Sequence, residues 1–275
     1  MSEKPRVAME EHQAGGLHWR IFTSSAAAST PLVILHGLFG AGDNWRSQAQ
    51  ALAEERPVLI PDMPNHGRSC HTADTRYPSV AQLVWRALDE LDLPFSGGSV
   101  HLLGHSMGGK VAMGMAFARP RGVSDLMVAD IAPRAYAPSH GEIFAAMNEV
   151  AAAGVGRRGE AERRMAERIP EKAVRLFLLK SLVPDEDGTY RWQLNLPALE
   201  AGYDDITDWP YTEEQFSGES LFIAGGKSTY IQARDGAAMD RHFPSHRVET
   251  IVHAGHWLHA EAREEFLQIV RATLS

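Results

Sequence analysis

The sequence LLGHSMGGKVAMG, residues 102–114, places one serine between two glycines, directly after an apolar run and directly before a helical pattern. A tight turn between a buried strand and a helix forces its central residue into a strained backbone conformation. Glycines on both sides remove side chains that would collide with the strand and the helix. The hydroxyl of Ser106 would stand at the head of that helix, where aligned N–H groups favour developing negative charge. This setting predicts a nucleophile rather than a plain turn serine.

Short apolar runs alternate with helical patterns along the chain. Six of these runs contain Gly, Pro or Asp near their ends and are typical of buried parallel strands: residues 31–37, 57–63, 100–105, 126–133, 220–226 and 248–255. An N-terminal hairpin around Gly15 and Gly16 adds two strands. Helices are expected at residues 44–55, 79–91, 107–118, 230–243 and 257–273. The sequence predicts an α/β fold with a mostly parallel eight-stranded sheet and helices on both faces.

Residues 136–212 interrupt this alternation, because they contain no convincing buried strand and are too many for a loop in a compact domain. Residues 141–154, 159–169 and 171–182 look helical, and an irregular, aromatic-rich stretch follows at 188–210. We expect a mainly helical cap at 136–212, inserted after the sixth strand, with residues 1–135 and 213–275 forming the catalytic domain. The alternative is extra bulk that serves only stability.

Composition restricts the class of protein. The chain has 275 residues, of which 44% are hydrophobic and 23% charged, as in soluble globular proteins. Its net charge of −8 gives no long-range attraction for nucleic acid or anionic membranes. No apolar stretch has the length of a membrane span or of a signal-peptide core, and the single cysteine, Cys70, excludes an intramolecular disulfide. We therefore expect a cytoplasmic protein with no nucleic-acid partner and no membrane span.

A serine nucleophile needs a base to take its proton and donors to bind the oxyanion. Among the thirteen histidines, His256 lies between the last predicted strand and the last helix, at the same sheet edge as Ser106. It is the predicted base. The predicted oxyanion donors are the backbone N–H groups of Leu38 and Met107, with the N–H of Phe39 as the alternative to that of Leu38.

The other histidines near this edge have a simpler explanation. His36, His66 and His105 lie in loops or strand ends there and are expected to be structural residues. His256 and His259 are three residues apart, but neither an HExxH pattern nor a cysteine cluster accompanies them. The sequence therefore predicts no metal site.

Five stretches together resemble the α/β-hydrolase superfamily, and particularly its YbfF-like esterases: residues 35–45, 61–69, 104–113, 128–136 and 254–261. The resemblance covers the whole predicted catalytic domain, and YRWQLNL at 190–196 looks similar to a cap segment of that group. It implies a carboxylic ester or thioester hydrolase that forms a serine acyl-enzyme and uses no cofactor. Dehalogenases and epoxide hydrolases of the superfamily carry Asp where this chain has Ser106.

The orienting acid departs from the usual pattern of the superfamily. Most members place it just after the seventh strand, where this chain has Ser228, whose neutral hydroxyl cannot stabilise an imidazolium as a carboxylate does. Asp235 comes too late after that strand. Asp130, at the end of the sixth strand, keeps the hydrolase order of nucleophile, acid and base. The predicted triad is Ser106, Asp130 and His256, with Ser228 at most an auxiliary hydrogen-bond partner.

The expected substrate is a small-molecule ester or thioester. Coenzyme A thioesters are included because the predicted cap is locally basic, although interleaved glutamates indicate a solvated face. Apolar side chains are expected around the substrate, yet in an inserted segment such side chains form the segment's own core just as often. They are Phe39, Phe144, Trp192, Leu196, Trp209 and Trp257.

Three other functions fit the same motifs. The superfamily also contains cofactor-free C–C bond hydrolases and serine haloperoxidase-like proteins, which share these residues. A binding protein that has kept the pocket and lost the chemistry is the third alternative. No oligomeric state is predicted.

Overall fold

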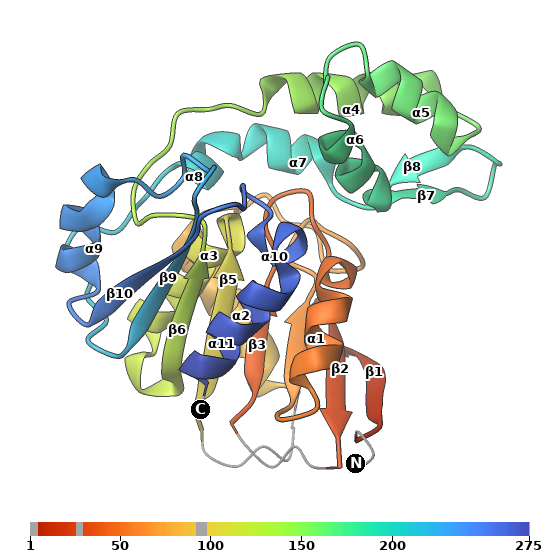
Figure 1. Ribbon diagram of the computed structural model, residues 1–275. Helices are drawn as coiled ribbons and strands as arrows, with labels where there is room; N and C mark the ends of the chain where they lie inside the picture. Colours follow the sequence, from red (N-terminus) through yellow and green to blue (C-terminus); the bar gives the residue numbers. More distant parts are fainter. Residues whose placement is uncertain (1–4, 26–29, 92–97, 275) are drawn as a thin grey trace.

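A computed structural model describes residues 5–25, 30–91 and 98–274 of the chain. Its centre is an eight-stranded sheet with the strand order β1-β2-β4-β3-β5-β6-β9-β10 (Figure 1). The strands are β1 Val7–Ala14, β2 Leu17–Ser24, β3 Leu32–Leu35, β4 Val58–Pro61, β5 Val100–His105, β6 Val123–Ala129, β9 Ser220–Gly225 and β10 His246–Ile251. Strand β2 pairs antiparallel with β1 and β4, and the remaining pairs are parallel. The predicted fold class is confirmed.

Helices cover both faces of the sheet. The helices of this domain are α1 Arg46–Leu52, α2 Tyr77–Asp89, α3 Met107–Ala118, α9 Gly236–His242, α10 Leu258–Glu261 and α11 Arg263–Thr273. Helices α2, α3 and α9 pack on one face of the sheet, and α1, α10 and α11 pack on the other. The side chains of successive residues in β5 point to opposite faces of the sheet: Leu102 packs on the α2 and α3 side, and Leu103 on the α1 and α11 side. This alternation follows from the period of two in a strand, and it buries both faces.

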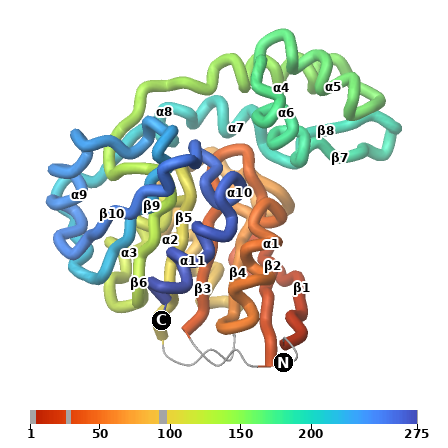
Figure 2. The backbone as a smooth tube through the Cα atoms, viewed as in Figure 1, coloured from red at the N-terminus to blue at the C-terminus, as the bar shows by residue number. Residues whose placement is uncertain are grey.

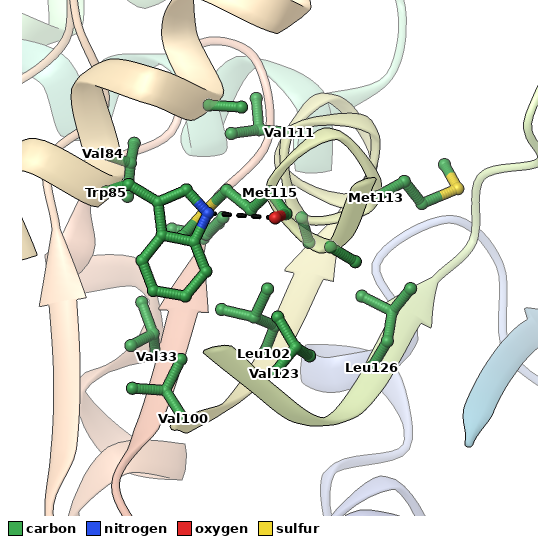
Figure 3. Close-up of a cluster of buried hydrophobic side chains, with 14 of the residues drawn as sticks. Val33, Val84, Trp85, Val100, Leu102, Val111, Met113, Met115, Val123 and Leu126 are labelled. Atoms are coloured by element: carbon green, nitrogen blue, oxygen red, sulfur yellow. Dashed lines mark hydrogen bonds between the residues drawn. The ribbon is translucent and has the colours of Figure 1, made fainter. Parts of the chain in front are cut away.

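The core under α2 and α3 illustrates this packing. Figure 3 shows Leu102 and Leu126 of the sheet beneath Met115 of α3 and Trp85 of α2. The indole N–H of Trp85 donates to the backbone oxygen of Met115 at 3.0 Å, so this buried ring is hydrogen-bonded as well as packed. The contact fixes α2 against α3, the helix that follows Ser106.

Residues 136–212 leave the sheet after β6 and return before β9, as Figure 2 traces. They form α4 Gly141–Ala153, α5 Arg158–Met165, α6 Lys172–Leu178, β7 Leu182–Pro184, β8 Tyr190–Trp192, α7 Leu196–Ala201 and α8 Tyr203–Thr207. Strands β7 and β8 make a small antiparallel hairpin of their own. We call residues 136–212 the cap. It has its own apolar core, which also receives Phe39 from the loop after β3.

Three details differ from the expectation. The stretch 188–210, expected to be irregular, contains β8, α7 and α8. Strands of three residues are too short to show a periodic pattern. The helix expected at 230–243 begins only with a 3-10 turn at Ala233–Asp235 and continues as α9, because the chain before it forms the loop beside the candidate site. The last helix is divided between α10 and α11 at Ala262, which has an extended φ of −133°.

Candidate active site

Ser106 occupies the turn between β5 and α3 with a φ of 54° and a ψ of −123°. This left-handed φ is unfavourable for a residue with a side chain and persists only where the surroundings enforce it. A Cβ added to Gly104 would lie 2.2 Å from the backbone oxygen of Gly108, and one added to Gly108 would lie 2.3 Å from that of Leu35. Only glycine fits at these two positions. The close approach of β3, β5 and α3 therefore sets the position of Ser106.

Asp130 follows β6 and is fully buried, with a φ of 52°. Its Oδ2 accepts hydrogen bonds from Nδ1 of His256 at 2.7 Å and from the hydroxyl of Ser228 at 2.5 Å. Its Oδ1 accepts the backbone N–H of Gly225 at 3.0 Å. Both carboxylate oxygens are thus hydrogen-bonded, which compensates the burial of this group. Asp130 and Ser228 follow different strands, and the hydrogen bond to Oδ2 of Asp130 joins them.

The ring of His256 is held on several sides. Its Nδ1 donates to Asp130, so Nε2 carries the lone pair and acts as the acceptor. The ring of Tyr230 stacks on the imidazole at a centroid distance of 4.1 Å and an angle of 19°. The backbone oxygen of His256 accepts a hydrogen bond from Nε2 of His105 at 2.8 Å. These contacts give the imidazole one orientation and one tautomer.

In the loop after β3, the backbone N–H of Phe39 is hydrogen-bonded within the protein, whereas that of Leu38 faces the site without an acceptor among the described residues. The N–H of Phe39 donates to Nε2 of His66 at 3.1 Å. For the N–H groups of Leu38 and Met107 there is no acceptor within the described part of the chain. Leu38, Ser106 and Met107 line one cavity together. Of the two donors considered for this loop, only Leu38 is therefore free to bind a substrate oxygen.

Two neutral histidines hold this loop. Nδ1 of His66 donates to the backbone oxygen of Pro64, which leaves Nε2 as the acceptor for Phe39. Nε2 of His36 accepts the N–H of Met63 at 2.9 Å. Burial, together with the nearby His36, lowers the pKa of His66 to about 3, and burial also lowers the pKa of His36. Both rings stay neutral near pH 7 and act as hydrogen-bonding parts of the loops.

Two cavities meet at Ser106, and both are lined by Leu38, Ser106, His140 and Tyr230. One has a volume of about 260 Å³, and we call it the apolar cavity. Its walls include His256 and these apolar side chains: Phe39, Trp45, Ile143, Val174, Phe177, Leu178 and Trp257. The other has a volume of about 360 Å³ and contains Lys110, Arg134 and Arg234 among its lining residues. We call it the cationic cavity.

The apolar residues predicted to surround the substrate divide into two groups. Phe39 and Trp257 line the apolar cavity. Phe144, Trp192, Leu196 and Trp209 line neither cavity, which corrects the expectation for these four. The first three are buried in the cap core, where the indole N–H of Trp192 donates to the backbone oxygen of Met147. The ring of Trp209 packs on Phe117 and Tyr211 instead. The first three thus support the packing of the cap, and Trp209 packs against the core of the sheet domain.

Sequence reasoning missed two residues at the junction of the cavities. Tyr230, two positions after Ser228, could have been suspected from its place in the loop after β9. His140 has no such signal, because only the packing of the cap brings it beside Ser106. Nδ1 of His140 is hydrogen-bonded to the hydroxyl of Tyr203, and burial lowers the pKa of His140 to about 4. His140 is therefore a neutral ring in the roof of the site.

The basic stretch of the cap is largely paired. Arg168 contacts Glu142 at 3.0 Å and Glu149 at 2.6 Å, and Arg164 contacts Glu160 at 3.3 Å. These pairs offset part of the positive charge of the stretch.

The described residues contain neither a cluster of metal ligands nor a helix that could cross a membrane. No three His, Cys, Asp or Glu side chains in them converge as metal ligands would. Nor does any helix in these segments combine the length and the apolar character that crossing a membrane requires.

A family model described as the alpha/beta hydrolase fold matches residues 30–262. The chain belongs to the α/β-hydrolase family. It is 39% identical over 254 residues to the sn-1-specific diacylglycerol lipase ABHD11 of Xenopus tropicalis, covering 89% of this chain and 78% of that protein. It is 34% identical over 248 residues to esterase YbfF of Escherichia coli (strain K12), covering 90% and 94% of the two chains.

A solved structure of a marine microorganism esterase matches with a TM-score of 0.87 and 35% identity, covering 97% of this chain and 100% of that one. The resemblance to YbfF-like esterases within the α/β-hydrolase family is thereby confirmed. The names of these relatives, esterases and a lipase, support ester hydrolysis as the general kind of activity.

Proposed function

We propose that the protein is a serine esterase that cleaves carboxylic esters through an acyl-enzyme, with Ser106 as nucleophile, His256 as base and Asp130 as the orienting acid. The observation that carries the proposal is the hydrogen bond from Nδ1 of His256 to the buried Asp130, which leaves Nε2 as the acceptor beside a cavity that Ser106 also lines. A base held in this tautomer can take the proton of a nearby hydroxyl.

The reaction proceeds in two halves. Oγ of Ser106 attacks the ester carbon while Nε2 of His256 takes the proton of the serine. The N–H groups of Leu38 and Met107 stabilise the oxyanion of the tetrahedral intermediate that forms. Collapse of this intermediate breaks the bond to the alcohol, whose oxygen receives the proton from His256. Water, deprotonated by the same imidazole, then attacks the acyl-enzyme, and the acid is released as His256 returns the proton to Oγ of Ser106. The buried Asp130 stabilises the imidazolium in both halves, and Ser228 supports the carboxylate through its hydroxyl.

Thioesters are part of the proposal, because a thioester carbonyl is open to the same attack and a thiol leaves in place of the alcohol. Coenzyme A receives no added support from the cap, since Arg164 and Arg168 already pair with glutamates. The leaving group of the natural substrate is therefore best sought with a panel of esters and thioesters of different acyl length.

Replacement of the nucleophile tests the proposal. Ser106→Ala should lower kcat for an aryl ester by about 10³-fold or more, because no other group forms the acyl-enzyme. Circular dichroism should show an unchanged fold. If the purified variant keeps more than a tenth of the wild-type kcat, another nucleophile acts and the proposal is wrong.

A further inference from the structure

The cationic cavity concentrates positive charge beside the nucleophile. Its lining residues include Lys110, Arg134 and Arg234 but no aspartate or glutamate. This is unexpected in a chain whose net charge is −8. Confined charges of one sign in a partly closed site attract a ligand group of the opposite sign.

Lys110 is almost completely buried, with 1% of its surface exposed. Its ammonium donates to the backbone oxygens of Thr207 and Asp208, at 3.0 and 2.6 Å, where α8 ends. It also lies 5.0 Å from the ring centre of Tyr136. Burial lowers the pKa of this group to about 7, with the charge of Asp208 opposing the shift and that of Arg134 adding to it. The amine therefore lies in surroundings that contain too little negative charge to hold its proton firmly.

The guanidinium of Arg134 lies over the same ring of Tyr136, at 3.7 Å from its centre. Its Nε donates to Asp235, a buried carboxylate that does not line the cavity. Arg234 is exposed, and in the described segments its side chain forms no hydrogen bond or ion pair. Asp235 thus pairs with Arg134, while Arg234, the more exposed of the two guanidinium groups, has no partner among the described residues. The two guanidinium groups carry one more positive charge than this carboxylate balances.

The position of the base indicates which half of an ester enters this cavity. His256 lines the apolar cavity but is absent from the walls of the cationic cavity. The protonated base must reach the leaving oxygen to release the alcohol. The alcohol therefore belongs on the side of the apolar cavity, and the acyl chain extends from Ser106 into the cationic cavity.

We propose that the acyl group of the preferred substrate ends in a carboxylate, so that the substrate is a half-ester of a dicarboxylic acid. The guanidinium groups of Arg134 and Arg234 bind the carboxylate. Arginine suits this role because its planar group binds carboxylates through two parallel hydrogen bonds. This inference rests on the proposed esterase activity and narrows its substrate class.

A matched pair of substrates tests the inference. Mono-2-naphthyl adipate and methyl 2-naphthyl adipate have the same leaving group and chain and differ only in the terminal charge. The wild type should have a kcat/KM about tenfold or more higher for the half-ester, since a charge-assisted hydrogen bond is made only with the carboxylate. This preference should shrink as salt is added.

Two variants locate the effect. Arg234→Gln breaks no hydrogen bond that the structure records, and it should reduce the preference for the half-ester severalfold. Arg134→Gln with Arg234→Gln should bring the ratio of the two kcat/KM values close to one. Arg163→Gln, which removes a charge from exposed α5 outside the cavity, is the control and should leave the ratio unchanged. Circular dichroism of each variant verifies that the fold is retained.

Three results would overturn the inference. The first is a wild-type preference for the methyl-capped ester or none at all, and the second is a preference that survives the double replacement. The third is a larger effect on kcat/KM when the carboxylate is on the alcohol instead of on the acyl group. It is tested with two hexanoate esters whose phenol carries either a propanoate group or the methyl ester of that group. If the capped ester is cleaved with Ser106 while the charge preference is absent, only this inference fails. If neither ester is cleaved, the proposed esterase function fails with it.

Discussion

Asp130 is the residue on which the proposed chemistry depends, since its Oδ2 accepts from both His256 and Ser228. Asp130→Asn preserves the shape but presents an amide that favours the wrong tautomer of the imidazole. We expect kcat to fall by about 10²- to 10⁴-fold. Burst-titrated active sites in the kinetic assay separate this loss from partial unfolding. Near-normal turnover would place the acid elsewhere.

Ser228→Ala is the matched replacement on the other side of the same carboxylate. It removes one neutral hydrogen bond and leaves the charge, so kcat should fall by about tenfold or less. The two variants therefore separate the carboxylate from the hydroxyl as the source of the effect. A loss equal to that of Asp130→Asn would make Ser228 an essential member of the triad.

The sequence predicts where the candidate catalytic residues lie in the fold but not all of the contacts around them. Ser106, Asp130 and His256 each follow a strand at the same sheet edge, so their proximity follows from the order of elements. The contacts of Tyr230 with His256 and of Phe39 with His66 were not predictable, because they depend on loop conformations that no pattern encodes. The presence of Ser228 at the usual position of the acid pointed to Asp130, and the hydroxyl of Ser228 in fact donates a hydrogen bond to Oδ2 of Asp130.

At the scale of elements, the turn between β5 and α3 depends on glycine more than on any apolar contact. A Cβ on Gly108 would overlap the backbone of β3, so Gly108→Ala should destabilise the fold by about 3 kcal/mol or more. Gly141→Ala is the matched control, because nothing lies within 4 Å of the added methyl group there. Urea denaturation should show a loss only for the first variant. Equal midpoints for both would mean that the turn is not closely packed.

Elements with a strong pattern were predictable and short ones were not. The buried strands of the main sheet carry apolar runs, and α3 has the predicted bounds of 107–118. In the cap, β7, β8, α7 and α8 are too short to carry a period. Strand β8 and helix α7 pack against α4, while β7 pairs with β8 and α8 packs against α7. Which cap side chains form its core and which line a cavity was therefore beyond the sequence, as Phe144 and Trp192 illustrate.

At the scale of the whole molecule, buried neutral histidines should make the fold sensitive to acid. His36, His66, His105 and His259 are buried, and burial lowers the pKa of each, to about 3 in His66 and His259. The unfolded chain binds protons below about pH 6.5 that the folded chain does not, so stability falls as the pH drops. Each such group contributes about 1.4 kcal/mol per pH unit below that value.

Urea denaturation at pH 7.5 and pH 5.5 measures this loss. His259→Phe removes one titrating group and keeps a ring against Trp45, so it should reduce the pH dependence of the unfolding free energy. A wild-type stability that is the same at both pH values would contradict the neutral state of the buried rings.

The activation of Ser106 by His256 and Asp130 is the central claim, and labelling with a serine-directed fluorophosphonate followed by peptide mapping tests it most directly. The reagent phosphonylates a hydroxyl only where a base activates it and an oxyanion site receives the P–O group. We expect one label per chain on Ser106, lost in Ser106→Ala and slowed strongly in Asp130→Asn. A wild-type chain that stays unlabelled, or that carries the label on another residue, would contradict the claim.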